Sequence, residues 1–262
     1  MACSCKTGRR TALQLIDKHI NNQETYSFDF AALEPLTWKE GDSSALVVTI
    51  DSVGLEDSRK LSYATVPEEK VVRFTTRIRH EASLFKKELK KLSVGDFVDV
   101  TLPEGNFGLR REGRPALLLS NGVGVATMRA LVKAFDYDPS GIGLLTQINV
   151  DGSGTIYKEE FESLLLDNEN FTSIYVAHRD QFYEAVDDAT RQLMFGSGSM
   201  PYFYVVGSDS FIEDVTLYLE GSGFESGDIL NDKQGCGCGT SKIHEVKVVN
   251  KVTLGRALQL KK

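Results

Sequence analysis

Cysteine is scarce in this sequence, and none occurs between residues 6 and 235. The four cysteines of the 262 residues form two Cys-x-Cys pairs, Cys3/Cys5 and Cys236/Cys238. A disulfide-rich fold distributes its cysteines along the chain, and redox or structural zinc sites use the wider Cys-x-x-Cys spacing. The pattern therefore excludes a disulfide scaffold. It leaves two interpretations of the pairs: reduced thiols, or a disulfide or shared four-thiolate metal site if the fold brings the two ends together.

Long apolar runs and excess positive charge are also absent. No stretch approaches the ~20 apolar residues that a membrane-spanning helix needs, and no apolar segment of the signal-peptide type precedes Thr11. The formal net charge of −7 gives no reason to expect nucleic acid or an anionic membrane as a partner. We therefore expect a cytoplasmic protein. Its 41% of hydrophobic residues suffices for ordinary cores, and its length predicts one large domain or two smaller ones.

The first half of the chain has the pattern of β structure. Short runs rich in Val, Ile, Thr and Phe are separated by clusters of Gly, Asp, Pro and Ser, which indicates five or six strands. Short strands at this spacing predict a small antiparallel barrel. A helix is expected at 83–92, because positions 85, 89 and 92 are apolar and share one helical face, and Ser83 is a suitable N-cap. The expected strands are 13–19, 25–30, 45–50, 71–78 and 97–102.

The second half alternates strands with helices, which predicts a parallel, doubly wound sheet. The strands are expected at 116–119, 143–148, 171–177 and 202–206, and the helices at 128–135, 158–166, 182–194 and 211–220. We therefore divide the chain into a barrel domain at 1–112, an α/β domain at 113–235 and a tail at 236–262. The role of the tail is open, although Val246, Val248 and Val249 suggest a strand within it.

Two short segments, one in each half, carry the chemistry. In RKLSYATVP, residues 59–67, the Arg could bind a diphosphate, the Leu could cover the face of an isoalloxazine ring, and the Ser could hydrogen-bond its N5 edge. In the second segment, the apolar strand 117–119 leads into Gly122-Val123-Gly124, where backbone and a helix N-terminus can approach a pyrophosphate. Taken alone, each segment is also compatible with a surface strand or an ordinary turn. Together they predict a flavoenzyme that takes a hydride from a nicotinamide dinucleotide.

This arrangement resembles the ferredoxin–NADP reductase superfamily over roughly residues 20–233. The family's Arg-x-aromatic-Ser flavin motif matches Arg59 and Ser62, with Leu61 at the aromatic position, and Ala64-Thr65-x-Pro67 continues the match. The resemblance implies an FAD-binding barrel in which Ser62 is the catalytic hydrogen-bond donor near N5. The flavin-binding set that it implies is Arg59, Leu61, Ser62, Tyr63, Thr75, Thr76, Arg77, Glu81, Ala82 and Ser83.

The resemblance continues in the second domain. The segment 122–127, GVGVAT, is similar to the family's Gly-x-Gly-x-Thr/Ala-Pro motif, and Gly207 matches the late Gly of its Cys-Gly-Pro motif, with Val206 at the Cys position. Arg179 falls where members that prefer NADPH carry Ser-Arg, next to His178. The dinucleotide-binding set implied is therefore Gly122, Val123, Gly124, Thr127, Arg179 and Gly207.

The resemblance implies FAD as cofactor and NADPH or NADH as hydride donor. The sequence has no haem or iron–sulfur ligand spacing, so we expect the electrons to pass to a separate acceptor: a ferredoxin, a flavodoxin, another subunit or a small oxidant. Two related alternatives stay open. The chain could be an electron-transfer subunit of a larger redox complex, or it could bind nucleotide without turnover.

Residues 149–161 also match the pattern of an EF-hand calcium loop. Its ligand positions hold Asn149, Asp151, Ser153 and Glu160, and its turn position holds Gly154. Pro139, Gly141 and Gly143 interrupt the entering helix that an EF-hand requires. We therefore expect no metal site here. A calcium-binding module without enzymatic activity is the alternative from a different class of function.

Overall fold

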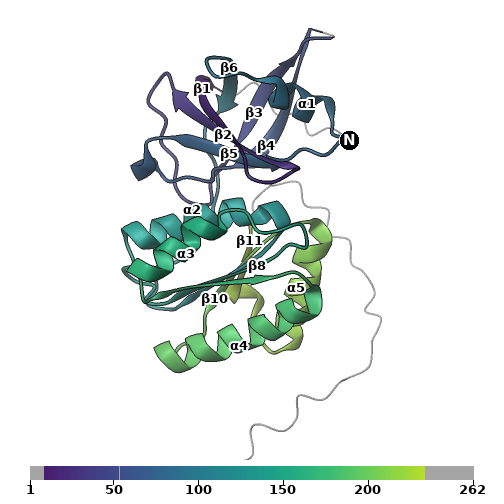
Figure 1. Cartoon of the computed structure of the whole chain (residues 1–262). Helices are drawn as coiled ribbons and strands as arrows, with labels where there is room; N and C mark the ends of the chain where they lie inside the picture. The colour runs from purple at the N-terminus through teal and green to yellow at the C-terminus, as the bar shows by residue number, and fades with distance from the viewer. Residues whose placement is uncertain (1–8, 53, 234–262) are drawn as a thin grey trace, which may run out of the picture.

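The structure is a computed structural model that describes residues 9–52 and 54–233. Both Cys-x-Cys pairs and the tail 236–262 lie outside the described residues. A barrel and an α/β body lie one above the other (Figure 1). This architecture confirms the predicted order of an antiparallel barrel followed by a parallel α/β sheet. Within the described ranges, none of the helices combines the length and the apolar character needed to cross a membrane.

The barrel is a single curled, antiparallel sheet of six strands. They are β1 (Arg10–Ile20), β2 (Thr25–Ala32), β3 (Ser43–Ile50), β4 (Leu55–Ser62), β5 (Val72–Arg77) and β6 (Phe97–Thr101). Their spatial order is β4-β3-β6-β1-β2-β5. The two edges meet just beyond the end of β4, where Tyr63 and Phe74 form an antiparallel bridge. This contact protects part of the two edge strands from pairing with another chain.

Aromatic side chains fill the interior of the barrel. Tyr63 is fully buried, and its ring stacks on Trp38 with the centroids 5.3 Å apart. Phe74 lies 5.0 Å from the same tyrosine ring. The helix α1 (Leu84–Lys91), which was predicted from its apolar face, buries Phe85 and Leu89 against this core. Full burial of one such apolar side chain stabilises the fold by about 1.5–3 kcal/mol. The buried side chains of the barrel form a hydrophobic cluster of their own.

The second domain is built on a parallel sheet of five strands. They are β7 (Ala116–Asn121), β8 (Leu145–Val150), β9 (Phe171–Val176), β10 (Tyr202–Val206) and β11 (Ile229–Asn231), in the spatial order β11-β10-β7-β8-β9. The chain starts at β7, moves outward to β9, and then returns to β10 on the other side of β7. The strand order therefore reverses between β7 and β10, and a ligand crevice is expected at their carboxyl ends.

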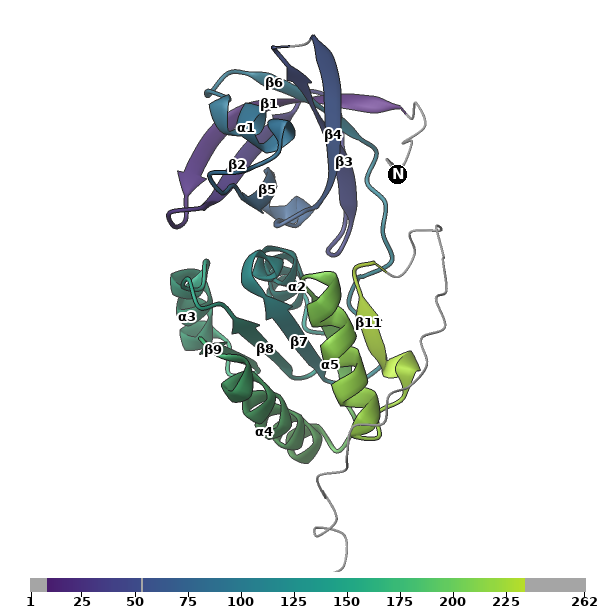
Figure 2. The same cartoon turned by 90° about the vertical axis from the view of Figure 1, so that its right-hand side faces the viewer.

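Helices cover both faces of this sheet. The helices α2 (Val125–Tyr137) and α3 (Lys158–Asp167) lie on one face, and α4 (Arg179–Ser197) and α5 (Asp209–Gly221) on the other (Figures 1 and 2). All four were predicted, although α2 begins three residues earlier than the expected 128. The short strand β11 was not predicted.

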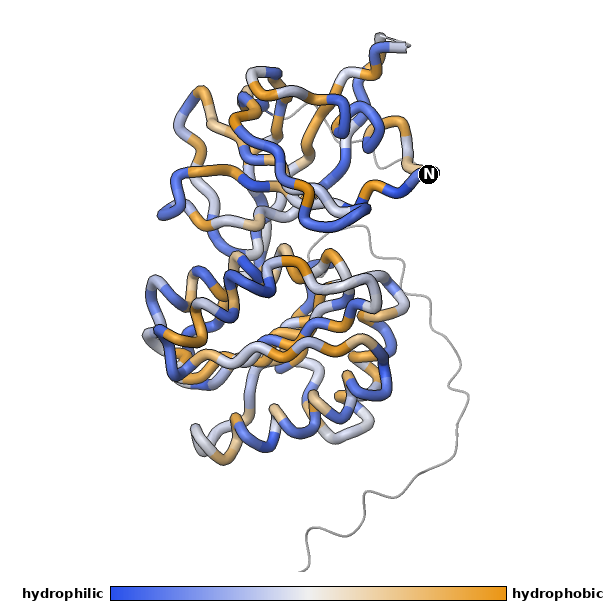
Figure 3. The backbone as a smooth tube through the Cα atoms, viewed as in Figure 1, coloured by the Kyte–Doolittle hydropathy of each residue, from blue (hydrophilic) through white to orange (hydrophobic). Residues whose placement is uncertain are grey.

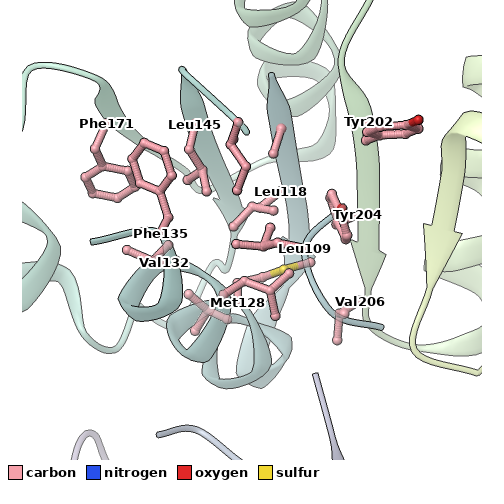
Figure 4. Close-up of a cluster of buried hydrophobic side chains, with 14 of the residues drawn as sticks. Leu109, Leu118, Met128, Val132, Phe135, Leu145, Phe171, Tyr202, Tyr204 and Val206 are labelled. Carbon is pink, nitrogen blue, oxygen red and sulfur yellow. The ribbon is translucent and has the colours of Figure 1, made fainter. Parts of the chain in front are cut away.

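Alternate residues of the parallel strands point to opposite layers. Leu118 and Tyr204 pack with the α2 and α3 side (Figure 4), whereas Leu117 and Phe203 pack with α4 and α5. A strand buried on both faces needs a nearly continuous apolar run. This is why hydrophobic residues follow the strands of this domain, while the helices alternate in hydropathy (Figure 3).

Candidate functional site

A cleft of about 370 Å³ lies between the two domains at the point where the strand order reverses. The ends of β4 and β5 form the barrel wall. The turn η2 (Gly122–Gly124), which follows β7, and the residues after β10 form the opposite wall. The cleft thus brings together most of the predicted site: Leu61, Ser62, Thr75, Thr76, Arg77, Gly122, Val123, Gly124, Thr127 and Gly207.

Two glycines let the backbone form the floor of the cleft. A Cβ atom on Gly124 would lie 2.8 Å from the carbonyl oxygen of Val206, and one on Gly207 would lie 2.6 Å from the ring of Phe211. A side chain at either position would therefore displace its neighbours. The helix α2 starts at this floor without a side-chain hydrogen bond to its cap. The positive end of the α2 dipole suits an anionic group such as a pyrophosphate.

Arg77 reaches from the end of β5 across the domain boundary. Its Nη2 donates to Oδ2 of Asp151 at 2.7 Å and to Oγ of Ser153 at 3.2 Å. The Nε of Arg77 is buried and has no hydrogen-bond partner among residues 9–52 and 54–233. A buried donor without a partner costs about 1–3 kcal/mol. This nitrogen is therefore a point at which a ligand with an acceptor group would gain binding energy.

A second cavity of about 380 Å³ lies at the N-terminal end of α1, and Arg77 lines this cavity as well as the cleft. Its other lining residues are Arg79, Glu81, Ala82, Ser83 and Lys86. Burial lowers the pKa of Lys86 below its usual value, and the positive charges of Arg79, Arg59 and Arg77 lower that pKa further. Cations crowded beside a helix N-terminus repel one another until an anion neutralises them. The cavity therefore has the charge that a diphosphate requires.

Three predicted residues line neither cavity. Arg59 pairs with Asp57 at 2.6 Å, and its positive charge helps to lower the pKa of Lys86, which lines the second cavity. Tyr63 lies inside the barrel core. Because adjacent side chains of a strand point to opposite faces, Tyr63 is directed inward where Ser62 faces the cleft. Arg179 is the first residue of α4 and pairs with Asp214 at 2.5 Å.

The EF-hand pattern does not correspond to an EF-hand structure. The strand β8 precedes the segment, where an EF-hand would have a helix. The side chain of Asn149 is buried in the sheet and accepts a hydrogen bond from Ser120, while Asp151 binds Arg77 and Glu160 binds Arg129. In the described part of the chain, His, Cys, Asp and Glu side chains form no group of three or more that could hold a metal ion.

Two residues near the cleft were not among the predicted site residues. Asp232 follows β11 and lines the cleft, and burial raises the pKa of its carboxyl group to about 6. Tyr157 precedes α3, and its hydroxyl group lies 2.6 Å from that of Thr75 on the opposite domain. Both positions depend on contacts between distant segments, so neither periodicity nor spacing could have revealed them.

Comparison with known proteins extends this picture. No protein-family model matches the chain. It is 24% identical over 239 residues to the toluate 1,2-dioxygenase electron transfer component of Pseudomonas putida, a match that spans 87% of this chain and 69% of the relative. It is 32% identical over 106 residues to cytochrome b5 reductase 4 of Homo sapiens, a match that spans 38% of this chain and only 20% of the relative.

A solved structure with a similar fold is a ferredoxin NADP+ reductase from Neisseria gonorrhoeae with bound FAD and NADP. The TM-score is 0.71 with 13% sequence identity, and the match covers 85% of this chain and 97% of that one. A barrel and a parallel sheet that share a cleft at the strand-order reversal define a class of two-domain proteins. This chain has a fold similar to that of the ferredoxin NADP+ reductase, as the resemblance inferred from its sequence implies.

Proposed function

We propose that this protein is an FAD-dependent NAD(P)H oxidoreductase, which transfers a hydride from the nicotinamide to the flavin and passes electrons to a separate acceptor. The observation that carries the proposal is the cleft itself, because it places Ser62 and Arg77 of the barrel opposite the Gly122–Gly124 turn. The names of the relatives support the same class of reaction, since they are an electron transfer component and two reductases.

The residues of the barrel wall fit a flavin nucleotide. Leu61 offers an apolar surface for a flat ring, and Ser62 is the proposed catalytic hydrogen-bond donor near the N5 edge. Arg77 and Ser83 are proposed to bind the diphosphate. The Nε of Arg77 has no hydrogen-bond partner among the described residues, and the positive charges around the start of α1 would be neutralised by an anion. The bound flavin would supply the redox chemistry, and the chain would supply orientation, hydrogen bonds and charge.

The α/β wall fits the nicotinamide dinucleotide. The floor at Gly124 and Gly207 is proposed to admit the pyrophosphate to the N-terminus of α2. Arg179 is the proposed contact for a 2′-phosphate. Its Nη1 pairs with Asp214, and the other N–H donors of the guanidinium are proposed to bind the phosphate.

The acceptor is proposed to be a separate redox partner. The Pseudomonas putida relative is by name an electron transfer component of a dioxygenase, so a protein partner of that kind, a ferredoxin or a flavodoxin is consistent with the likeness. A small oxidant is the other form that the acceptor could take.

The visible absorption spectrum of the purified protein tests the proposal. We expect the yellow spectrum of an oxidised flavin, which should bleach under anaerobic conditions when NADH or NADPH is added. The nucleotide that bleaches it faster is the preferred donor. A colourless protein that does not take up added FAD would sink the proposal, and a flavin that neither nucleotide bleaches would restrict the protein to nucleotide binding.

Replacing Ser62 by alanine should slow hydride transfer without releasing the flavin. One well-placed hydrogen bond at a reacting centre is worth about 1.4–2.8 kcal/mol, which corresponds to about 10–100-fold in rate. Stopped-flow reduction of the flavin measures this rate directly. Ser62→Thr keeps the hydroxyl group and is the matched control, with a rate expected near that of the wild type. Equal rates for the alanine variant and the wild type would remove Ser62 from the catalytic role.

A further inference from the structure

Three hydroxyl groups meet at the boundary between the domains. Ser27 in β2 and Thr75 in β5 belong to the barrel, and their oxygens are 2.7 Å apart. Tyr157 belongs to the α/β domain, and its phenol oxygen lies 2.6 Å from Thr75 and 3.1 Å from Ser27. The three groups are therefore close enough for each to hydrogen-bond with the other two.

This hydroxyl triad separates two cavities. Thr75 lines the cleft proposed to hold the flavin. Ser27 and Tyr157 line a different cavity of about 410 Å³, which also lies between the domains and is bordered by His19, Arg73 and Glu160. Thr75 thus forms part of the cleft wall, while its hydroxyl group meets those of Ser27 and Tyr157.

The chemistry of the three groups makes Tyr157 and Thr75 the strongest pair of the triad. A phenol is a stronger acid than an aliphatic alcohol and hence a better donor, and the shortest of the three contacts joins Tyr157 to Thr75. Burial raises the pKa of the Tyr157 hydroxyl above its usual value, so the group keeps its proton at neutral pH. Ser27 already accepts a hydrogen bond from Nδ2 of Asn21 at 2.8 Å. The contact between Tyr157 and Thr75 is the shortest hydrogen bond of the three, and either hydroxyl group can be its donor.

The surrounding structure holds Tyr157 in an unfavourable backbone conformation. Its φ angle is +62°, in the left-handed region that residues with a Cβ atom seldom occupy. Its ring packs on Phe161 with the centroids 6.5 Å apart, and the guanidinium of Arg129 lies 5.4 Å from the ring centre. Contacts from α2 and α3 thus fix the tyrosine in the one direction that reaches the barrel.

We propose that Tyr157 is a positioning residue that acts through Thr75: its hydroxyl group crosses the domain boundary and fixes the Thr75 side chain in the flavin cleft. The part concerning the flavin rests on the proposed function. When the Tyr157 hydroxyl is absent, Thr75 keeps its hydrogen bond to Ser27 but loses the one that ties it to the α/β domain, so its side chain is held less firmly. The barrel wall of the cleft is then less ordered around Thr75, and the flavin binds more weakly.

The test compares Tyr157→Phe with Tyr175→Phe. Both changes remove a single phenol oxygen, but the hydroxyl of Tyr175 contacts the carbonyl of Lys158, at 3.4 Å, and lies outside the cleft. We expect Tyr157→Phe to weaken FAD binding about 10-fold, the effect of one lost hydrogen bond. Tyr175→Phe should change it less than about twofold on the same scale. Fluorescence titration of the flavin-free protein measures the affinity.

A double substitution separates positioning from general stability. If Tyr157 acts through Thr75, then adding Tyr157→Phe to Thr75→Val should weaken FAD binding no further. Losses that simply add, or wild-type affinity in Tyr157→Phe, would overturn the proposal.

Amide hydrogen exchange provides a readout that needs no flavin. Exchange in β5 should be faster in Tyr157→Phe than in Tyr175→Phe, and equal rates would count against the boundary role. If the wild type binds no FAD, the proposed function fails and Tyr157 has no flavin to position, while the exchange rates still decide whether it holds the two domains together.

Discussion

Replacing Arg129 by methionine is expected to lower the free energy of unfolding by about 3–5 kcal/mol, the usual cost of breaking a buried ion pair from one side. Arg129 lies in α2 and is only 4% exposed. It donates to the carbonyl oxygen of Ala64 at 2.6 Å and to both carboxylate oxygens of Glu69, at 2.6 and 3.0 Å. It also binds Glu160 at 2.5 and 2.7 Å.

The size of this effect follows from what remains after the substitution. Methionine fills much of the same volume, but the Ala64 carbonyl and the Glu160 carboxylate lose the Arg129 donors, and the partly buried Glu69 keeps the backbone N–H of Val66 but loses its countercharge. Ala64 and Glu69 belong to the barrel and Glu160 to α3, so one side chain joins both domains. Urea unfolding followed by far-ultraviolet circular dichroism measures the change.

Arg191→Met is the matched control for this prediction. Arg191 pairs with Asp188 on α4, but its side chain is 68% exposed. An exposed pair of this kind contributes about 0.2–1 kcal/mol at most. If the two arginine variants were equally stable, Arg129 would be no more than another surface ion pair.

Asp232→Asn is expected to stabilise the ligand-free protein at pH 8 and to leave its stability unchanged below pH 4. The carboxyl group has a pKa of about 6 in the folded chain, against an ordinary value of 3.8, because burial disfavours its charge. Its Oδ1 has no hydrogen-bond partner among the described residues. The difference corresponds to about 2–3 kcal/mol, since one pKa unit is worth about 1.4 kcal/mol.

The sign of this effect depends on pH in a defined way. Below pH 4 the group is protonated in the folded and unfolded states alike, so it adds no penalty. Between pH 4 and 6 the folded state binds more protons than the unfolded state, and stability falls as the pH rises. Above pH 6 the folded chain carries the full cost of a buried charge, which asparagine removes.

Unfolding curves of the wild type and Asp232→Asn at pH 4, 6 and 8 test this prediction. Asp209→Asn is the control, because Lys233 lowers the pKa of the Asp209 carboxyl group and the two side chains form an ion pair. Removing that charge should give no gain in stability at pH 8. If the stability difference between wild type and Asp232→Asn did not vary with pH, burial would not raise the pKa of the Asp232 carboxyl group in the folded protein.

Local patterns were enough to predict most of the fold. Strand–helix alternation in the second half fixes which end of each strand faces the next helix, so the place of Gly122–Gly124 at the cleft followed from chain order alone. The strand β4 was harder, because LEDSRKLS has neither an apolar run nor regular alternation. It forms because its backbone pairs with the whole length of β3. The amino-acid sequence of β4 alone gives no indication of this pairing.

The site was predictable where a motif occupies one strand or turn, and not where two domains meet. Ser62 and Gly124, which both line the cleft, could be predicted because each belongs to a motif contained within one strand or turn. Tyr157 meets Thr75 across 82 residues, and Arg129 meets Glu69 across 60. Such pairings depend on how the domains dock.

The position of Trp38 gives the molecule an optical probe that belongs to one domain. It is the only tryptophan of the sequence. Its ring stacks on Tyr63 in the barrel, and its indole N–H donates to the carbonyl of Thr65 at 2.8 Å. Tryptophan emission therefore follows the melting of the barrel, while circular dichroism follows both domains. When the two signals coincide, the domains unfold as one cooperative unit, and when they separate, the boundary has opened first.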